Sequence, residues 1–480
     1  MTKSSKEGLK VLPSGTVLQG LTSTNAVIAT NTRRRDYDAV VIGAGFAGLT
    51  AARDLAKAGY SVAIVEARDR IGGRTYLAYD DGQKYEMGGT WIHWNQPFVW
   101  REVENYGLDI AETLGSTPET FSVLTASGLR TGSAEEFGPI ADQAITNFCN
   151  VDGYNGAVAV PRPYNVTGES IAEYDQLSLA DRMQELNLDE VSYTFVSSLV
   201  SMNAGNDPAV SALSEQLRWW ALGNYSTFSM LERLGKYKLL NGTASLAVAM
   251  LKDSEADLFL NKPVVSVKKT GTLVEVTTVE GDVFRAATVI SAIPLNVLKQ
   301  ISFEPPLRPG QERASSEGHV CKAVKFFAHV DRDLGAWIGF AAYPNPIIMA
   351  VSDRTVDGRS VIIGFGPQGG LDLKDISSVE VELGKLVPGI KIERLYTHDW
   401  NDDPYASGGW LWLRPGQTTE CLADLQHLEA PVFFASGDWA RGWRGFIDGA
   451  IEDGARNARA AIDYLRKLNA DTPSLLHPRS

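Results

Sequence analysis

The sequence predicts an α/β fold built around a parallel sheet, and three observations lead to that prediction. Residues 39–42 (Ala-Val-Val-Ile) and 62–65 (Val-Ala-Ile-Val) are continuous apolar runs, which are typical of strands buried on both faces. A glycine-rich turn at residues 43–48 separates them. After it, apolar residues recur at helical spacing over residues 49–56. Strand, helix and strand thus occupy residues 38–65, a compact βαβ unit.

The rest of the chain alternates between helical and strand patterns. From about Trp100 to Trp220 the pattern is helical, with helices expected over residues 178–188, 190–202 and 211–222. Strands are expected over residues 264–267, 273–278, 283–290, 320–330, 360–365 and 432–435, and a helix over residues 445–467 closes the fold. The uncharged stretch 334–352 has the length of a membrane span. Because Pro344 and Pro346 interrupt it, we expect two buried strands there.

Length and composition restrict the class of protein. The chain has 480 residues, about three times the usual domain size, so two domains or one large elaborated unit are expected. Hydrophobic residues make up 44% and charged residues 21%, an ordinary globular composition. The net charge of −13 argues against nucleic-acid binding, because a phosphate backbone would be repelled. The basic cluster at residues 33–35 is interpreted as a solvated linker.

Cysteine and histidine usage argues against a metal site. Cys149, Cys321 and Cys421 are far apart, and the sequence has no CxxC motif or Cys/His cluster, so neither a disulfide framework nor a zinc site is predicted. Residues 1–32 lack the apolar core of a secretory signal. Residues 478–480 differ from the Ser-Lys-Leu peroxisomal address. We expect a soluble, intracellular, cytoplasmic protein, and a peroxisomal location stays open.

The turn of the βαβ unit predicts a dinucleotide site. Residues 43–48 read Gly-Ala-Gly-Phe-Ala-Gly, a G-x-G-x-x-G motif between a strand and a helix. The first glycine permits the tight turn, the second lets the backbone approach a pyrophosphate, and the third lets the helix pack closely on the strand. Glu66 follows 18 residues after Gly48, where a carboxylate can accept hydrogen bonds from ribose hydroxyls. Glutamate there does not distinguish FAD from NAD.

Two further glycine pairs extend this site. Residues 66–75 read Glu-Ala-Arg-Asp-Arg-Ile-Gly-Gly-Arg-Thr. The glycine pair suits a second approach to the pyrophosphate, where Arg74 gives charge-assisted contacts. Residues 88–91, Gly-Gly-Thr-Trp, form another close-approach turn with an aromatic residue.

Together these motifs resemble the flavin-containing amine oxidase family. Besides the first glycine motif, Arg-x-Gly-Gly-Arg at residues 70–74, Gly-Gly-x-Trp at 88–91, Gly-Asp at 437–438 and Phe-Ile-Asp-Gly-Ala at 446–450 occur in family order and cover most of the chain. Within the family, soluble fungal monoamine oxidases with non-covalent FAD are the nearest likeness. Residues 88–94, 150–153, 294–298 and 442–454 carry that likeness.

The resemblance implies the two-domain fold of amine oxidases and p-hydroxybenzoate hydroxylase. In it, a Rossmann-type FAD-binding domain is assembled from discontinuous segments, and an α+β substrate domain is inserted. We therefore expect an N-terminal arm at 1–35, an FAD-binding domain at 36–95, 238–330 and 428–468, a substrate domain at 96–237 and 331–427, and a tail at 469–480.

The resemblance also implies which residues bind the cofactor. The ADP half of FAD would contact Gly43, Gly45, Phe46, Ala47, Gly48, Glu66, Ala67, Arg68, Gly73, Arg74 and Val264. The flavin half would contact Gly89, Thr90, Trp91, Trp400, Gly437, Asp438, Phe446, Ile447 and Ala450. Asp438 stands where the family has glutamate. Gly409 stands where family members with covalent FAD have cysteine, so we expect FAD to be bound non-covalently.

Three residues are the expected catalytic group. Trp410 and Phe446 match the aromatic pair that flanks the substrate amine, a place where mammalian monoamine oxidases have two tyrosines. An aromatic face attracts a cationic amine through its quadrupole; the alternative is that both rings are ordinary core residues. Lys325 matches the lysine that holds a water near flavin N5, unless it is a snorkelling lysine. Trp91 and Trp94 complete the expected substrate site.

The resemblance implies oxidative deamination of a primary amine, either aliphatic, with long chains included, or arylalkyl. Hydride transfer to flavin N5 would yield an aldehyde or ketone, ammonia and hydrogen peroxide. The alternatives are an amine dehydrogenase with a protein acceptor, a polyamine or amino-acid oxidase, or a non-catalytic FAD-binding protein. The expected partners are a small-molecule amine and dioxygen, with neither nucleic acid nor a membrane. A homodimer or higher homo-oligomer is left open.

Overall fold

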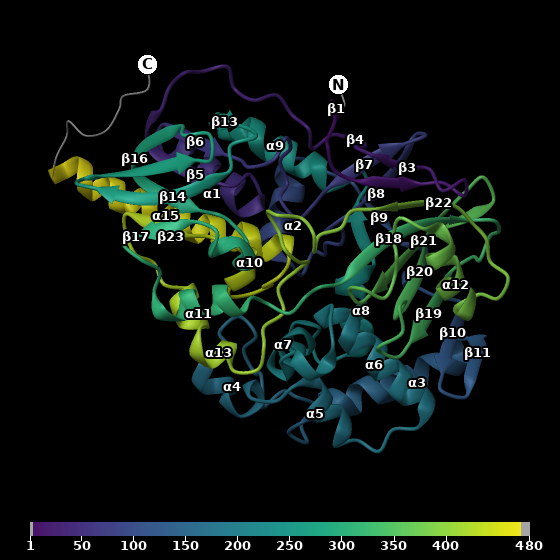
Figure 1. Ribbon diagram of the computed structural model, residues 1–480. Coiled ribbons are helices and arrows are strands. Elements are labelled where there is room, and N and C mark those ends of the chain that lie inside the picture. Colours follow the sequence, from purple (N-terminus) through teal and green to yellow (C-terminus); the bar gives the residue numbers. More distant parts are fainter. Residues whose placement is uncertain (1–2, 472–480) are drawn as a thin grey trace.

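The computed structural model describes residues 3–471, which form two large sheets with helices packed around them (Figure 1). The predicted C-terminal tail, 469–480, lies mostly outside these residues. Among the described residues, no helix combines the length and the apolar composition needed to cross a bilayer.

The first sheet has eight strands and contains the predicted βαβ unit. The strands on its main path, in spatial order, are β13 (Asp257–Phe259), β6 (Val62–Val65), β5 (Asp36–Ile42), β16 (Val283–Ser291), β15 (Leu273–Thr278), β14 (Val264–Thr270) and β17 (Ser302–Glu304), and β23 (Val432–Phe434) pairs with β16. β5 pairs in parallel with both β6 and β16, as the apolar runs predict. β14, β15 and β16 continue as antiparallel neighbours.

Three helices cover one face of this sheet. They are α1 (Phe46–Lys57), α9 (Thr243–Ser254) and α15 (Ile447–Asp471). Their apolar faces and the strands share one buried cluster that includes Val41, Leu49 and Ile451. The long α15, yellow in Figure 1, lies against α1 and ends near the left edge of that view. The closing helix is therefore confirmed, four residues longer at its C-terminus than expected.

The second sheet has nine strands, which come from residues 9–19, 120–133 and 324–397. Its order is β11 (Gly128–Ser133), β10 (Thr120–Thr125), β19 (Trp337–Ala341), β20 (Met349–Val356), β21 (Arg359–Gly366), β18 (Val324–Val330), β22 (Ile392–Thr397), β2 (Leu9–Val11) and β3 (Val17–Gln19). β19 and β20 are the two strands expected in the uncharged stretch 334–352. α12 (Ile376–Leu386) covers part of this sheet.

Helices dominate the remaining layer, at the bottom of Figure 1. They are α3 (Ala134–Cys149), α4 (Gly168–Asp175), α5 (Leu179–Gln184), α6 (Glu190–Ala204), α7 (Leu213–Leu222) and α8 (Thr227–Gly235). Shorter elements connect the parts: α2 (Pro97–Asn105), η1 (Leu114–Ser116), η2 (Pro208–Val210), α10 (Leu295–Leu298), α11 (Pro309–Glu317), α13 (Gln417–Glu420), α14 (Leu422–Leu425), η3 (Gly437–Trp439) and the two-stranded sheet of β9 (Ile110–Glu112) and β12 (Tyr237–Leu239).

Three expectations need correction. The expected N-terminal arm, 1–35, contains regular structure, because β2 and β3 join the nine-stranded sheet and β1 (Lys3–Ser4) and β4 (Thr22–Ser23) join β7 (Leu77–Asp80) and β8 (Gln83–Glu86) in a four-stranded sheet. The region from Trp100 to Trp220 is not purely helical, since β10 and β11 form a hairpin there. β18 pairs with β21 and β22, so residues 324–330 lie in the second sheet, whereas we expected them beside the strands of the first. The domain boundaries stay predictions.

Candidate active site

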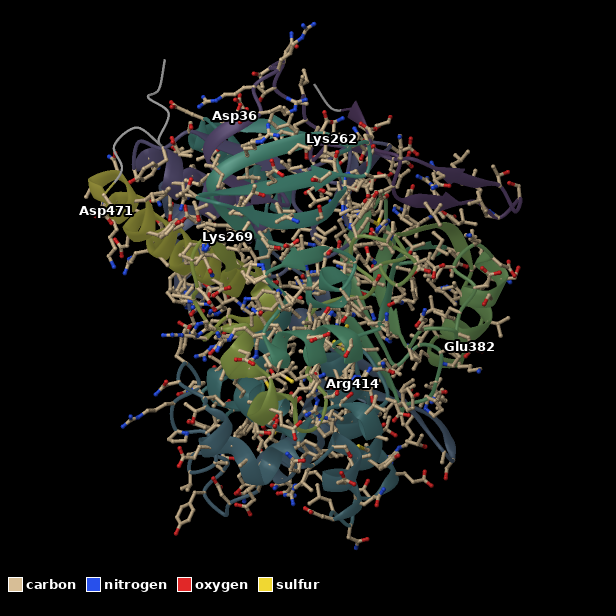
Figure 2. The ribbon with its side chains drawn as sticks, turned by 60° about the vertical axis from the view of Figure 1, so that its left-hand side comes forward. Asp36, Lys262, Lys269, Glu382, Arg414 and Asp471 are labelled. Carbon is tan, nitrogen blue, oxygen red and sulfur yellow. The ribbon has the colours of Figure 1, made fainter. Side chains whose placement is uncertain are left out.

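One cavity of about 1070 Å³ extends between the two sheets. At one end it is lined by Glu66 and Val264, beside the eight-stranded sheet, and at the other by Leu199 and Phe340. Single-ligand pockets have volumes of roughly 300–1000 Å³, so this cavity has room for a dinucleotide and a small second ligand. Figure 2 shows Lys262, another lining residue, beside the eight-stranded sheet, and Glu382 far from it on the outer side of the molecule.

The glycine turn after β5 has the geometry that the motif predicts. Gly43 has φ +97°, and a side chain there would lie 2.8 Å from Ala292 O. A Cβ on Gly48 would collide with Gly43 O, so this glycine serves close packing and does not line the cavity. Within the described residues α1 has no side-chain cap and no acidic residue in its first turn. Its free N–H groups can therefore bind a phosphate.

The second glycine pair lies against the first. Gly73 has φ +60°, and a Cβ there would lie 3.2 Å from Gly45 Cα. A Cβ on Gly88 would collide with Arg74 O. The turns thus form a cradle in which a ligand can approach the backbone closely. Side chains at these glycine positions would fill the cradle. This cradle, together with the uncapped helix terminus, fits the pyrophosphate of FAD.

Glu66 follows β6 and lies beside the glycine turn. The residue is 5% exposed, and its carboxylate accepts hydrogen bonds from Ala44 N at 2.6 Å and Arg68 N at 2.8 Å. Burial raises the pKa of Glu66, and the Arg68 charge and these two amides oppose that effect. The residue lines the cavity, and so do Phe46, Ala47 and Ala67.

The two predicted arginines have different surroundings. Arg68 donates to both oxygens of Asp403 at 2.6 and 2.8 Å and to Glu7 at 2.7 Å, so carboxylates occupy its guanidinium group. Arg74 donates to Asp438 at 2.6 Å and to Gly409 O at 2.9 Å. The other oxygen of Asp438 accepts from Leu295 N at 2.8 Å.

Asp438 itself does not line the cavity, whereas Gly437 and Arg74 do. Its buried carboxylate positions Arg74, and the expected contact of Asp438 with the cofactor stays a prediction. The sequence motifs gave no indication of Glu7 or Asp403. No local motif marks either residue, since each meets Arg68 through contacts more than 60 residues apart.

The flavin end of the cavity is lined by residues from several segments. This part of the cavity is lined by Gly89, Thr90, Trp91, Trp400, Ile447 and Ala450. Trp91 Nε1 donates to Thr113 at 2.9 Å, and Trp400 Nε1 donates to Met87 O at 2.8 Å, so both indoles have fixed orientations.

The two expected cage residues both line the cavity and are half-buried. Trp410 Nε1 donates to Asn203 O at 2.7 Å. The Phe446 ring lies 4.9 Å from the Trp219 ring and 5.2 Å from the Trp443 ring, measured between centroids. Trp94, by contrast, does not line the cavity: it is 44% exposed and packs on His93 and Tyr237.

Lys325 lies on β18, where it meets the turn at residues 88–90. Its ammonium group donates to Glu86 O at 2.7 Å, Gly88 O at 3.0 Å and Thr90 Oγ1 at 2.6 Å. Burial lowers the pKa of Lys325 to about 7, although the Glu86 and Asp353 charges oppose the shift. Lys322 lies before β18 and donates to Ser407 O at 2.7 Å.

Fold and site together define a flavoprotein oxidoreductase. The family model of flavin-containing amine oxidoreductases matches residues 46–462, and the chain belongs to this family. It is a flavin-dependent amine oxidoreductase, as the resemblance implied.

Two bacterial relatives extend over nearly the whole chain. A pseudooxynicotine dehydrogenase from Pseudomonas sp is 38% identical over 443 residues, covering 91% of this chain and 88% of that protein. A nicotine dehydrogenase from Pseudomonas putida is 33% identical over 434 residues, with 90% and 89% coverage. The likeness to fungal enzymes stays a prediction.

Solved structures share the fold. Cyclohexylamine oxidase from Brevibacterium oxydans superposes with a TM-score of 0.75 at 20% identity, covering 90% of this chain and 100% of that one. A putrescine oxidase bound to putrescine gives 0.74 at 22% identity, with 89% and 99% coverage. The two-domain amine oxidase fold is therefore confirmed.

Proposed function

We propose that the protein binds FAD non-covalently and oxidises the carbon beside the nitrogen of an amine with an apolar body. The continuity of the cavity carries this proposal. The glycine cradle and Glu66 lie at one end, and the aromatic chamber with Trp410 and Phe446 lies at the other. A ligand in the chamber is therefore next to the flavin half of the cofactor site.

The protein's own groups bind and orient the amine. The aromatic faces of Trp410 and Phe446 attract a cationic amine on entry, and the apolar lining favours the neutral form once it is bound. When bound, FAD supplies the oxidising chemistry by accepting a hydride from the substrate. Water then hydrolyses the resulting imine to a carbonyl compound and ammonia or a smaller amine. Turnover should rise with pH toward the pKa of the bound amine.

The electron acceptor has two candidates. Our first is dioxygen, which would make the protein a monoamine oxidase that releases hydrogen peroxide. The second is another acceptor, because the relatives at 38% and 33% identity are both named dehydrogenases. Those names also make nicotine and pseudooxynicotine candidate substrates, beside the primary alkyl and arylalkyl amines.

Anaerobic stopped-flow spectroscopy tests the proposal. The holoprotein is mixed with primary amines of graded chain length, arylalkyl amines, nicotine and pseudooxynicotine, and loss of flavin absorbance is followed. We expect at least one class to bleach the flavin; no bleaching by any amine would contradict the proposal.

Oxygen is then admitted to the reduced protein. Fast reoxidation with stoichiometric peroxide identifies an oxidase. Slow reoxidation that an added one-electron acceptor accelerates identifies a dehydrogenase.

A further inference from the structure

The amine end of the cavity contains buried polar atoms without a protein partner. Asn203 is 0% exposed, Trp219 and Thr227 are each 5% exposed, and all three line the cavity. Among the residues that the structure describes, none pairs with Asn203 Oδ1, Trp219 Nε1 or Thr227 Oγ1. An unpaired buried polar atom keeps the full cost of its lost hydration. Three such atoms on one cavity therefore indicate groups that pair with a ligand.

These atoms adjoin the aromatic cage. Asn203 lies on α6, its backbone oxygen accepts from Trp410, and its amide nitrogen donates to Gln216 at 3.0 Å. The bond to Gln216 fixes the amide and leaves Oδ1 as the unpaired atom. Trp219 lies on α7, and its ring centroid is 4.9 Å from that of Phe446 and 5.0 Å from that of Trp412.

Trp219 differs from the neighbouring tryptophans in this respect. Trp220 Nε1 donates to Asn155 O at 2.8 Å, and Trp412 Nε1 donates to Ala212 O at 3.1 Å. Both of these indoles are fully buried and neither lines the cavity. Of these three tryptophans, the one with the unpaired indole is also the one that lines the cavity.

We propose that Trp219 Nε1 and Thr227 Oγ1 are each a donor for a neutral hydrogen-bond acceptor on the body of the substrate, and we call these two donors the polar subsite. A carbonyl or ether oxygen, or an aromatic ring nitrogen, has this chemistry. Asn203 Oδ1, beside the Trp410 wall, accepts an N–H. The substrate class is then an amine whose apolar body bears one such acceptor. This inference rests on the proposed function and refines it.

The physical reason for selectivity is the cost of an unmet donor. A substrate without an acceptor leaves both the indole N–H and the hydroxyl buried and unpaired, whereas one that bears an acceptor pairs with at least one of these donors. Sites built to bond a polar substrate group discriminate strongly against analogues that lack it. An apolar pocket without these donors would prefer the hydrocarbon analogue.

Matched amine pairs test the subsite in the holoprotein. Each pair differs by one acceptor: phenylalkyl against pyridylalkyl amines, and a chain methylene against a ketone. The apparent Kd of each amine is obtained from anaerobic flavin reduction. In at least one pair, we expect the acceptor-bearing member to have an apparent Kd at least about tenfold lower than that of its hydrocarbon partner. Trp219→Phe and Thr227→Val should reduce that preference to about twofold or less.

Trp220→Phe is the matched control, because its indole is paired and lies off the cavity. Thermal melting of unliganded protein gives a readout independent of turnover. Trp220→Phe loses a bond and should melt earlier than wild type, whereas Trp219→Phe removes an unpaired donor and should melt at or above the wild-type temperature. If Trp219→Phe melts as early as Trp220→Phe, the indole N–H is paired within the protein and the subsite is refuted.

The two proposals fail in different ways. If no amine bleaches the flavin, the proposed function fails, and this inference fails with it. If amines bleach the flavin without a preference for acceptor-bearing members, the subsite alone is overturned.

Discussion

The ammonium group of Lys325 is held by acceptors at residues 86, 88 and 90. A lysine ammonium has three hydrogens, and Glu86 O, Gly88 O and Thr90 Oγ1 accept all three. The predicted role, holding a water beside the flavin, therefore requires one of these bonds to be exchanged. A strand pattern could place this lysine on β18 but could not show that the turn after β8 supplies its acceptors.

The depressed pKa of Lys325 gives a signed pH dependence. The folded-state pKa of about 7 lies below the ordinary lysine value of 10.5, so between these values the unfolded chain binds more protons. The contribution of this group to stability therefore rises with pH from about 7 to 10.5. Lys325→Met removes it. We expect the Tm difference, wild type minus variant, to increase from pH 7 to pH 10.

Thermal melts at fixed ionic strength check this expectation. Lys374→Met, on an exposed loop, serves as the control and should show a flat difference. A constant difference for Lys325→Met would mean that the lysine keeps its ordinary affinity for protons in the fold.

Trp410 is the residue on which the aromatic cage depends. Trp410→Ala removes one wall, so the carbon that gives up hydride is less well oriented. We expect the limiting rate of flavin reduction to fall at least about tenfold, or roughly 1.4 kcal/mol. Trp410→Phe keeps a ring and loses only the bond to Asn203 O, so it should reduce the flavin faster than the alanine variant.

A tryptophan with only a packing role predicts a different result. Truncating a fully buried one costs about 3–5 kcal/mol of stability, with early melting and loss of flavin. Stopped-flow and melting on the same preparation separate the cases. If the alanine variant melts early but its flavin is reduced at the wild-type rate, Trp410 is not part of the active site.

At the scale of elements, local signals predicted the long and apolar segments well. β15 spans the expected 273–278, and β16 extends the expected 283–290 by one residue. The N-terminal strands were missed because they have two or three residues and no periodicity to detect. Their pairing is also remote in sequence, since Leu9 of β2 lies opposite Thr397 of β22. Such contacts cannot be inferred from a local window.

The N-terminal segment has a structural role through Glu7. Its carboxylate bonds Arg68 at 2.7 Å and Arg70 at 2.7 Å, and both arginines are buried. His398 and Asp403 approach the same cluster, within 4.8 Å of Glu7. Burial alone would raise the pKa of Glu7, and the two arginine charges outweigh it, so the pKa is lowered. The segment thus neutralises the charges of Arg68 and Arg70, and Arg70 in turn donates to Gly73 O in the cofactor cradle.

Glu7→Gln should destabilise the fold by about 3 kcal/mol at pH 7. Removing one partner of a buried ion pair costs about 3–5 kcal/mol, and the lower end applies because the Glu7 side chain is 17% exposed. With a folded pKa below 4.5, the contribution is present above pH 4.5 and is lost as the pH falls through the folded pKa.

Urea unfolding at several pH values measures this effect, with Glu104→Gln on the exposed side of α2 as the control. The gap between wild type and Glu7→Gln should narrow as the medium becomes acidic. A gap that stays the same at every pH would show that the ion pairs contribute nothing and that only packing was lost.

At the scale of the whole molecule, the site is assembled from segments that span the chain. The lining of one cavity includes Val264, Gly409 and residues 43, 45–47, 66–68, 72–75, 88–91 and 445–447. The sequence predicted most of these positions because glycine motifs need particular backbone shapes. It misplaced Trp94 and passed over Asn203 and Thr227, since a side chain's access to a cavity depends on how separate helices pack.

This assembly makes the mode of cofactor attachment testable. The position matching the attachment cysteine of covalent flavoproteins is Gly409, which lines the cavity. A Cβ there would lie 2.8 Å from Cys321 Sγ, so Cys321 is a thiol beside this position. It is 0% exposed, does not line the cavity, and burial raises the pKa of its thiol to about 11. A protonated, enclosed thiol is a poor nucleophile.

We therefore expect acid or heat to release all of the FAD into the supernatant and to leave a colourless precipitate. Because a non-covalent ligand stabilises only the folded chain, added FAD should also raise the Tm. At an FAD concentration a thousand times Kd, the free energy of unfolding should increase by about 4 kcal/mol. Cys321→Ser should release flavin in the same way as wild type. Flavin that stays with the precipitated wild type but leaves the serine variant would identify Cys321 as an attachment point and contradict the prediction.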